Sequence, residues 1–195
     1  MIENMIIGGA PLDSLTEKRI LETSLNAYAT YGMTETLSHV ALRKVGAEDS
    51  YFALSGVTFS QDERGCLKID IPHLSIKEVT TNDMVDLIDS THFIWRGRFD
   101  NVINSGGVKI FPEEIEKLIA PYIKERFYVI GIPDTLWGEI CTLVIEDEEW
   151  NYEKQQNLLM QLKEALPKHK SPKQIKFLSK FVETYSGKVK RVVSF

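Results

Sequence analysis

The segment Tyr31-Gly32-Met33-Thr34-Glu35 places an aromatic ring, a hydroxyl and a carboxylate directly after an apolar stretch. A flat ring can stack on a base, a threonine hydroxyl can donate to a phosphate oxygen, and a glutamate can hold Mg²⁺. We expect this segment at the end of a strand, which is where α/β sheets bind ligands. It therefore predicts a nucleotide site. The alternative is a capped turn beside a partly buried tyrosine.

Two further side chains suit the same chemistry. Asp83 follows Asn82 among strand signals, and a carboxylate accepts from two hydroxyls at once, as a ribose diol requires. A turn aspartate is the simpler alternative. Lys188 follows Gly187 near the end of a basic segment, where an ammonium on a loop can stabilise a phosphoryl or carboxylate group. An exposed tail lysine is the alternative there.

The histidines predict no metal site, because their four positions fit no metal-ligand spacing. His39 is the only one near the predicted nucleotide site. Together with the preceding Ser38 it is a candidate for contact with a substrate.

The pair Gly106-Gly107 precedes a predicted helix and invites comparison with a phosphate-binding loop. The spacing matches neither GxGxxG nor GxxxxGK[ST]. Glu113, Glu114 and Glu116 also occupy the positive end of the helix dipole and would repel a phosphate. The glycines instead predict backbone curvature or the close approach of a thin ligand.

The elements that must position these residues fall into three regions. Residues 1–40 read as an α/β fragment, whose two strands and one helix cannot bury their own faces. Residues 41–97 contain short strands and turns, typical of a small antiparallel barrel or meander. The predicted elements in these regions are strands at 5–7 and 27–31, a helix at 15–25 capped by Ser14 with Glu17, and strands at 57–59, 67–71, 76–79 and 84–88.

The stretch from Trp95 to Glu116 has two turn signals and a helix start at Pro112, a density that predicts a joint between two bodies. Beyond it, residues 101–195 predict a compact α+β domain. Its elements are a helix from 112 kinked near Ala120 by Pro121, strands at 127–130 and 140–145, a helix over 158–166 closed by Pro167, and a strand at 175–178.

Composition predicts a cytoplasmic protein. No apolar run approaches the roughly 20 residues of a membrane helix, and the first residues lack the features of a signal peptide. The two cysteines, Cys66 and Cys141, form no CxxC motif and predict a reduced pair.

Charge is divided unevenly along the chain. From Lys163 onward nine basic residues face two acidic ones, a local balance of +7 that leaves −12 for the preceding residues. This predicts either a solvated lysine-rich surface or a positive lobe that meets phosphate groups. A nucleic-acid partner is not expected, because no aromatic-basic interleaving accompanies the charge.

Six stretches, in order, resemble the adenylate-forming family of acyl- and aryl-CoA synthetases, which also includes luciferases and peptide-synthetase adenylation domains. The resemblance covers essentially the whole chain. The six stretches are Gly8-Gly9-Ala10-Pro11-Leu12, Tyr31 to Glu35, Asn82-Asp83, Gly97 to Glu116 (similar to GRxDDxIKxxGxxIxPxEIE), Val129 to Asp134 with Trp137-Gly138-Glu139, and Ser186-Gly187-Lys188.

The resemblance implies formation of an acyl-adenylate from a carboxylic acid, ATP and Mg²⁺, followed by transfer of the acyl group to coenzyme A. The implied roles follow the family's motifs: an adenine pocket at Gly8, Gly9, Ala10, Tyr31 and Gly32; the α-phosphate at Thr34; Mg²⁺ at Glu35; the ribose hydroxyls at Asp83 and Arg98; and Lys188 as the catalytic lysine bridging the substrate carboxylate and the α-phosphate.

The resemblance also assigns the joint. Residues 98–100 correspond to the family's hinge with Asp100 as the pivot, and Gly106 and Gly107 flank the pantetheine tunnel of coenzyme A. The implied fold is the C-terminal part of the large AMP-binding domain in residues 1–97, comprising an α/β fragment and a β-barrel subdomain, followed by an α+β lid domain in residues 101–195.

This sequence departs from the family pattern in several places. Asn101 replaces the second aspartate, Asn104 replaces a lysine, and Val182-Glu183-Thr184 replaces Pro-[RK]-Thr. Nothing matches the Ser/Thr/Gly-rich loop that cradles the β- and γ-phosphates of ATP. We therefore expect the C-terminal portion of a ligase, incomplete for catalysis by itself.

Within the family, Thr36-Leu37-Ser38-His39-Val40, Thr81-Asn82-Asp83 and Ile103 to Gly107 look most like o-succinylbenzoate–CoA ligases of menaquinone synthesis. The expected small molecules are an aromatic or acyl carboxylic acid, ATP and coenzyme A. The alternative function is a non-catalytic nucleotide- or CoA-binding remnant, or one half of a split enzyme. The expected protein partner is a missing N-terminal half or a second copy of the chain.

Overall fold

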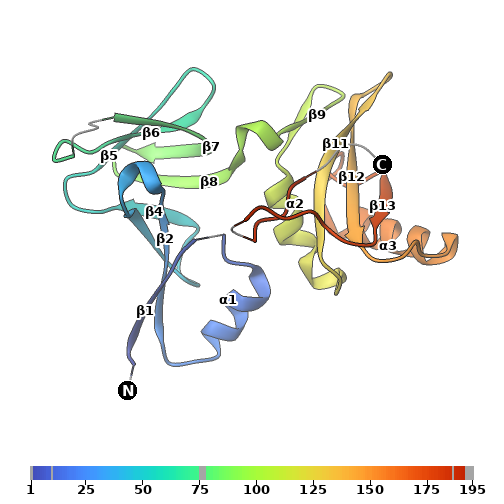
Figure 1. Ribbon diagram of the computed structural model, residues 1–195, viewed down its shortest axis with the longest axis horizontal. Helices are drawn as coiled ribbons and strands as arrows, with labels where there is room; N and C mark the ends of the chain where they lie inside the picture. The colour runs from blue at the N-terminus through green and yellow to red at the C-terminus, as the bar shows by residue number, and fades with distance from the viewer. Residues whose placement is uncertain (1, 10, 75–77, 186, 192–195) are drawn as a thin grey trace. The chain divides into compact units, whose positions relative to one another are not determined.

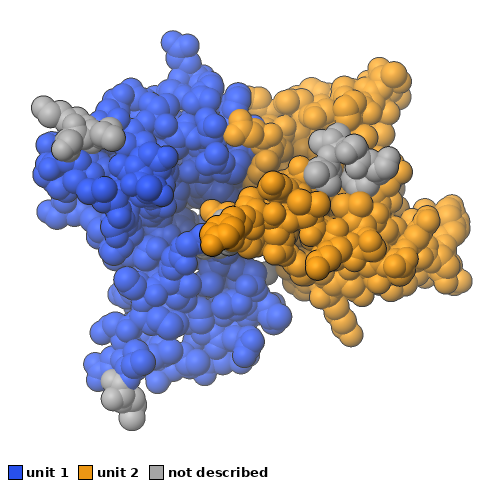
Figure 2. Space-filling view, in the orientation of Figure 1, with its two compact units in different colours: residues 1–99 blue, residues 100–195 orange. Residues whose placement is uncertain are grey.

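The computed structural model describes residues 2–9, 11–74, 78–185 and 187–191. They form two compact units, residues 1–99 and residues 100–195, which are coloured separately in Figure 2. In the described part of the chain, no helix is long and apolar enough to cross a membrane.

Unit 1 is built on one eight-stranded sheet with the order β1-β2-β3-β4-β8-β7-β6-β5 (Figure 1). β1 runs parallel to β2, and every other neighbouring pair is antiparallel. The predicted α/β fragment and the β region therefore share a sheet, and a separate barrel is not confirmed. The strands are β1 Asn4–Ile7, β2 Asn26–Gly32, β3 His39–Lys44, β4 Ser50–Ala53, β5 Thr58–Gln61, β6 Cys66–Asp70, β7 Glu78–Asp89 and β8 His92–Arg98.

Strand β7 contains all of the predicted strand 84–88 and the described part of the predicted strand 76–79, whose first two residues lie outside the described residues. The prediction of two separate strands was wrong. Its inward positions alternate Val79, Thr81, Asp83 and Val85, all buried. Two polar residues in this inward row interrupted the apolar pattern. The turn alternative for Asp83 is also wrong, because the residue lies within the strand.

Helix α1 spans Ser14–Leu21 and is shorter than the predicted 15–25. Asp13, rather than Ser14, is its N-cap, and the Asp13 carboxylate accepts from the Thr16 amide at 2.8 Å. The helix stops early because the Thr23 hydroxyl donates to the Ile20 carbonyl at 2.6 Å and accepts from the Leu25 amide at 3.2 Å.

The apolar cover of α1, β1 and β2 is thin. Ala27, Ala29 and Val45 are buried there, whereas Ile2, Ile6 and Leu21 are 73%, 60% and 56% exposed. A buried ion pair between Glu17 of α1 and Arg43 of β3 ties the helix to the sheet. The larger core of unit 1 surrounds Phe93 of β8.

Unit 2 contains a five-stranded sheet with the order β10-β9-β12-β11, to which β13 is added through parallel pairing with β12. The helix prediction at Pro112 is confirmed, and a 3₁₀ turn follows where Pro121 was expected to kink it. The elements are η2 Phe99–Asn101 at the unit boundary, β9 Ile103–Ser105, β10 Val108–Ile110, α2 Pro112–Ile119, η3 Ala120–Tyr122, β11 Phe127–Asp134, β12 Gly138–Glu146, α3 Tyr152–Ala165 and β13 Gln174–Leu178.

The two faces of this sheet are covered differently. One face packs on α2 and α3 in a core that includes Ile115, Leu143 and Leu162. On the other face, Tyr128 and Val144 pack against Phe181. The segment that follows β13 therefore closes the second face, and that segment leads to Lys188.

Candidate functional site

The parallel pair β1–β2 ends in the glycines predicted to line an adenine pocket. Gly8 follows β1, and a Cβ atom there would lie 2.2 Å from Thr30 Oγ1 of β2. A larger residue at Gly8 would therefore displace the Thr30 hydroxyl. Gly9 has a φ of +98°. The predicted site residue Ala10 lies outside the described residues.

The turn after β2 presents Thr34 and Glu35 to solvent. It begins at Gly32, where a Cβ atom would lie 2.3 Å from the Ser38 carbonyl oxygen, so that the returning backbone needs glycine. The buried hydroxyl of Thr36 accepts from the Met33 amide at 3.0 Å and lies 2.7 Å from the same Ser38 carbonyl. The short helix η1, Thr34–Thr36, is thereby fixed while its first two side chains stay exposed.

Three predicted site residues meet at Asp83. The Tyr31 hydroxyl donates to Asp83 Oδ2 at 2.7 Å, and Arg98 Nη1 lies 3.4 Å from Asp83 Oδ1. Arg98 faces Asp83 across the β7–β8 ladder, whereas Tyr31 reaches it from β2. Asp83 is 6% exposed, and its amide is bound to the Thr81 hydroxyl at 3.0 Å. A buried carboxylate with a fixed orientation results.

The ring of Tyr31 is held as firmly as its hydroxyl. It lies edge-on to Phe93 at 5.1 Å and to Tyr51 at 5.9 Å between ring centroids. Burial, and then the charge of Asp83, raise the pKa of the Tyr31 phenol well above its ordinary value. Tyr31 is therefore a neutral donor to Asp83, and its stacking on adenine stays a prediction.

A second acid–base pair on the same two strands provides a comparison. Asp86 and Arg96 also join β7 to β8, but Asp86 is 54% exposed and Arg96 is 38% exposed. Asp83 differs in being buried and in having a tyrosine donor as well.

The remaining predicted site residues of unit 1 are the candidate substrate contacts, Ser38 and His39, and the candidate metal ligand, Glu35. Ser38 Oγ and His39 Nδ1 are 3.1 Å apart. Among the described residues, no three His, Cys, Asp or Glu side chains form a cluster that would hold a metal alone. Mg²⁺ in phosphate sites commonly takes one or two carboxylates plus phosphate oxygens, and the exposed carboxylate of Glu35 fits that donor set.

Asp100, the predicted pivot, is exposed within η2, at the first residue of unit 2. The next residue, Asn101, donates to Glu113 Oε1 of α2 at 2.5 Å. This bond ties the chain to α2 just after the boundary. The hinge role of Asp100 stays a prediction.

Gly106 and Gly107 form the turn of the β9–β10 hairpin with φ values of +57° and +81°. A Cβ atom on Gly106 would lie 2.7 Å from Trp137 Cε3, while one on Gly107 would meet nothing within 4 Å. Both glycines satisfy backbone curvature, and Gly107 leaves open space beside the turn. The role of this turn toward coenzyme A stays a prediction.

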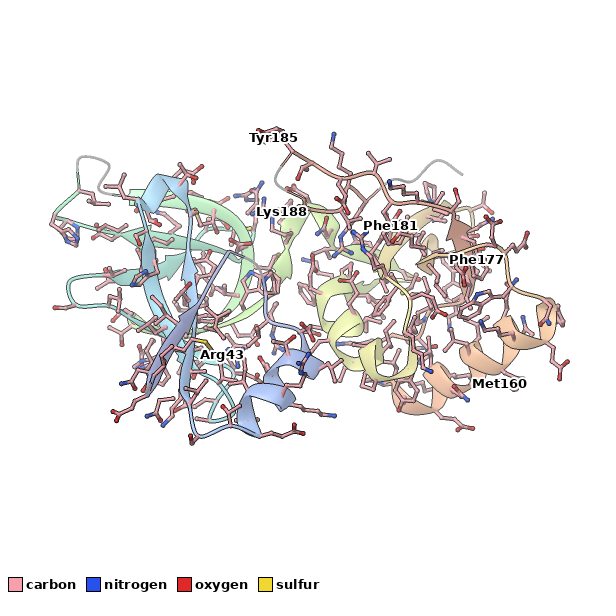
Figure 3. The ribbon with its side chains drawn as sticks, turned by 60° about the horizontal axis from the view of Figure 1, so that its bottom comes forward. Arg43, Met160, Phe177, Phe181, Tyr185 and Lys188 are labelled. Carbon is pink, nitrogen blue, oxygen red and sulfur yellow. The ribbon has the colours of Figure 1, made fainter. Side chains whose placement is uncertain are left out.

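Lys188 lies on a tight hairpin at the end of unit 2, labelled with Tyr185 and Phe181 in Figure 3. The Thr184 amide donates to the Lys188 carbonyl at 2.7 Å, and the Lys188 amide donates to Thr184 Oγ1 at 3.0 Å. Gly187 has a φ of +77°. The Lys188 side chain is exposed, which fits both the predicted catalytic lysine and the alternative of an exposed tail lysine, so its catalytic role stays a prediction.

An acid–base cluster beneath this hairpin was missed from the sequence. Arg191 forms a two-pronged pair with Glu116, Nη1 to Oε1 at 2.5 Å and Nη2 to Oε2 at 2.9 Å, and lies 3.6 Å from Glu113. Burial raises the pKa of Glu116, and the guanidinium of Arg191 opposes that shift. The available signal was the spacing of Glu113 and Glu116, which places two acids on one helix face.

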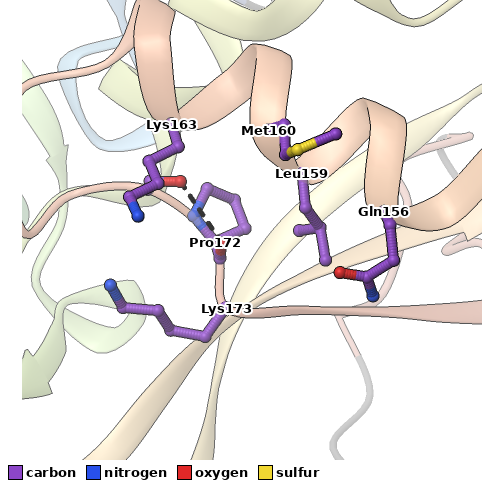
Figure 4. A pocket seen from close by; sticks show the side chains of 7 residues that line it. Gln156, Leu159, Met160, Lys163, Pro172 and Lys173 are labelled. Atoms are coloured by element: carbon purple, nitrogen blue, oxygen red, sulfur yellow. Dashed lines mark hydrogen bonds between the residues drawn. The ribbon is translucent and has the colours of Figure 1, made fainter.

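A pocket of about 270 Å³ lies between α3 and the turn before β13 (Figure 4). Leu159 and Met160 give it an apolar wall, and Lys163 and Lys173 supply two ammonium groups. None of the predicted site residues lines this pocket.

Comparison with known proteins places this geometry in a family context. Residues 114–188 match the family described as AMP-binding enzyme C-terminal domain. The chain is 29% identical, over 97% of its length, to 45% of a 2-succinylbenzoate–CoA ligase of Listeria monocytogenes. It is 27% identical, over 96% of its length, to 45% of a feruloyl-CoA synthase of Amycolatopsis. The chain thus spans about half the length of the curated relatives it matches.

A solved structure has the same fold. The o-succinylbenzoate CoA synthetase of Bacillus subtilis in complex with its acyl-adenylate intermediate superposes with a TM-score of 0.79 at 20% identity, over 95% of this chain and 44% of that one. The same synthetase with ATP and a magnesium ion gives a TM-score of 0.77 at 20% identity, over 96% and 45% of the two chains.

Proposed function

The chain belongs to the adenylate-forming family and corresponds to the C-terminal portion of its members, and we propose that it is part of an ATP- and CoA-dependent acid–thiol ligase. Such a ligase joins a carboxylic acid to the AMP moiety of ATP with release of pyrophosphate, and then transfers the acyl group to the thiol of coenzyme A with release of AMP. The observation that supports this function most is the meeting of Tyr31, Asp83 and Arg98.

Asp83 is proposed to hold the ribose of the adenylate. Its carboxylate can accept from both hydroxyls of a diol, and its burial strengthens hydrogen bonds to a charged acceptor. Tyr31 and Arg98 orient that carboxylate from two directions. Arg98 is proposed to contact the ribose as well, with adenine beside the Tyr31 ring and the backbone of Gly8, Gly9, Ala10 and Gly32.

The turn after β2 is proposed to meet the phosphate. The exposed Thr34 hydroxyl would donate to an α-phosphate oxygen, and Glu35 would share Mg²⁺ with phosphate oxygens. When bound, the metal would neutralise part of the phosphate charge. The buried Thr36 hydroxyl keeps both side chains on the exposed side of the turn.

Lys188 is proposed as the lysine that stabilises the charge on the attacking carboxylate and the α-phosphate. Removing one electrostatic group of this kind from a closed site typically costs about 10²–10³ in rate. Thioester formation would follow rotation about Asp100, with Gly106 and Gly107 beside the pantetheine arm of coenzyme A.

We propose o-succinylbenzoate as the acid, and hence a role in menaquinone biosynthesis. The similarity to 2-succinylbenzoate–CoA ligase supports this choice, but a feruloyl-CoA synthase is similar over the same length. Ser38 and His39 are the candidate contacts for the acid within this chain.

A non-catalytic module is the alternative: a nucleotide- or CoA-binding remnant, or one half of a split enzyme. We propose that these 195 residues by themselves do not complete adenylation, because nothing in them matches a Ser/Thr/Gly-rich phosphate loop. The thin apolar cover of α1, β1 and β2 supports it too, because these exposed side chains would gain from burial.

Complementation distinguishes a catalytic part of a ligase, including one half of a split enzyme, from a non-catalytic remnant, for which the pair would also give only background turnover. The chain is mixed with the preceding portion of the Listeria 2-succinylbenzoate–CoA ligase, and pyrophosphate release and thioester formation are measured with o-succinylbenzoate, ferulate and a fatty acid. We expect background turnover from the chain alone and thioester formation from the pair. Lys188→Ala should slow adenylation by about 10²–10³ while sparing thioester formation from supplied acyl-adenylate, and Lys190→Ala should change neither step. Rapid turnover by the chain alone would contradict the proposed incompleteness.

A further inference from the structure

Lys188 lies on a hairpin whose returning segment ends at a largely buried ion pair. The hairpin pairs Glu183 with Val189, and the Lys190 amide donates to the Val182 carbonyl at 2.8 Å. Arg191 follows directly, and its side chain turns inward while those of Lys188 and Lys190 stay exposed. Whatever fixes Arg191 therefore fixes the backbone three residues from the lysine.

Arg191 binds two elements of unit 2 at once. Its guanidinium makes both bonds to Glu116 of α2, and Nη1 also donates to the Val129 carbonyl of β11 at 2.7 Å. Glu116 in turn accepts from the Val129 amide at 2.6 Å. A carboxylate and a guanidinium joined in two places, with a shared backbone partner, leave little freedom of orientation.

The other end of the hairpin has a weaker attachment. Arg126 bridges Glu146 at 3.2 Å and Glu183 at 2.6 Å, but it is 51% exposed. Exposed pairs of this kind contribute little to stability. The side chains of Arg191 and Glu116 are only 23% and 20% exposed, so that breaking their pair leaves a buried charge without its partner. Of these ion pairs, the Arg191 attachment should therefore hold the hairpin more firmly, beside the packing of Phe181 and Val189 on the sheet.

We propose that Glu116 and Arg191 are positioning residues for Lys188, and that their ion pair fixes the position of the hairpin that carries Lys188 relative to the sheet of unit 2. This role gains its catalytic meaning from the proposed function of Lys188, but the placement itself is a property of the free chain. The pair acts through the backbone from Arg191 to Lys188 and does not contact a substrate.

The test uses the full 195-residue chain without substrate and measures amide hydrogen exchange by NMR. The reporters are the hydrogen-bonded amides of Gly187, Lys188 and Lys190, and the reference amides are those of Leu143 and Ile145 in the core strand β12. Arg191→Met removes the guanidinium and its two bonds to Glu116 at similar side-chain length. Arg191→Lys keeps the positive charge but not the two-pronged hydrogen bonding. Lys190→Met is the matched exposed control.

For Arg191→Met we expect at least a tenfold loss of hairpin protection with little change in β12, a partial recovery in Arg191→Lys, and no change in Lys190→Met. The Lys188 amide signal should shift in the same order. If Arg191→Met fails to fold, Glu116→Gln is measured in its place. It keeps an acceptor oxygen for the Arg191 guanidinium and should show a smaller loss of hairpin protection. Unchanged hairpin protection, or equal losses in hairpin and β12, would overturn the positioning role. Because no turnover is measured, that result would leave the ligase proposal standing.

Discussion

The hydroxyl of Tyr31, on β2, donates to the buried carboxylate of Asp83, on β7, at 2.7 Å. The two residues are 52 positions apart in sequence and belong to strands that are not neighbours in the sheet. The contact joins the turn that presents Thr34 and Glu35 to the strand that presents Asp83. It therefore links the proposed phosphate and ribose sites in unit 1.

Removing this hydroxyl should destabilise unit 1. Tyr31→Phe leaves Asp83 Oδ2 without this buried donor, and such a loss typically costs about 1–3 kcal/mol. Urea denaturation should show a lower midpoint with an unchanged slope. Tyr185→Phe is the matched control, because that ring is fully exposed and its substitution should leave the midpoint unchanged. Equal midpoints for all three proteins would show that the bond contributes nothing.

The Tyr31 phenol should also resist ionisation. Burial and the Asp83 charge raise its pKa, so the stabilisation from the neutral phenol is complete below its ordinary value near 10 and is lost as pH rises beyond it. Ultraviolet titration should show a late-ionising component that is lost in Tyr31→Phe and ionises earlier in Asp83→Asn. An ordinary titration in the wild type would contradict the buried contact.

The glycine at the turn after β2 should be sensitive to a single methyl group. In Gly32→Ala the new Cβ would meet backbone atoms, the Ser38 carbonyl oxygen at 2.3 Å and His39 Cα at 2.6 Å, so the turn must shift. We expect about 1–3 kcal/mol of destabilisation, the usual cost of overpacking. Gly56→Ala, whose new Cβ would meet only ordinary contacts at 3.7 Å, should cost only the strain of its φ of +81°. Identical losses would remove the steric explanation.

The pH dependence of the β7–β8 turn is set by Asp89. Hydrogen bonds from the Thr91 hydroxyl and amide, and from His92, lower the pKa of Asp89 to about 2. A lowered pKa means that its stabilising contribution is present above the ordinary value near 4 and is lost as pH falls through about 2. Carboxyl ¹³C NMR should record this midpoint. In Thr91→Val the midpoint should move up toward the ordinary value, and an unchanged midpoint would contradict the hydrogen-bond explanation.

Both cysteines should be unreactive in the native protein. Burial raises the pKa of the Cys141 thiol to about 12, and Cys66 is also buried. The thiolate is the reactive form, so a thiol reagent at neutral pH should label neither residue before unfolding and both after it. Labelling of one cysteine without denaturant would show that its core opens readily.

Much of this fold was predictable from local signals. The helix at Pro112 and the strands at 127–130 and 140–145 follow from a proline at a first helical turn and from runs of buried apolar residues. The boundaries of α1 were not, because the Asp13 side chain caps the helix start and the Thr23 hydroxyl bonds to the Ile20 carbonyl near its end. The continuity of β7 was hidden by polar residues at its inward positions.

The identity of the candidate site residues was predictable from the sequence, but their contacts in space were less so. Motif resemblance selected Tyr31, Asp83 and Arg98, but nothing in their spacing shows that the first two share a hydrogen bond. The Glu116–Arg191 pair joins residues 75 positions apart. From the sequence alone, Glu116 counts as a charge near a helix start and Arg191 as part of the basic segment that begins at Lys163. Such long-range pairings depend on how the strands and helices pack, which local patterns do not specify.

The central claim, that Asp83 holds a ribose diol, is tested most directly by titrating AMP into three proteins by calorimetry. These are the wild-type chain, Asp83→Asn and the matched control Asp86→Asn, with 2′,3′-dideoxy-AMP as the comparison ligand. We predict that Asp83→Asn weakens AMP binding at least tenfold, that Asp86→Asn stays within twofold, and that wild type prefers AMP over the dideoxy compound. Equal affinity of Asp83→Asn and wild type for AMP, or no preference between the two nucleotides, would contradict the account.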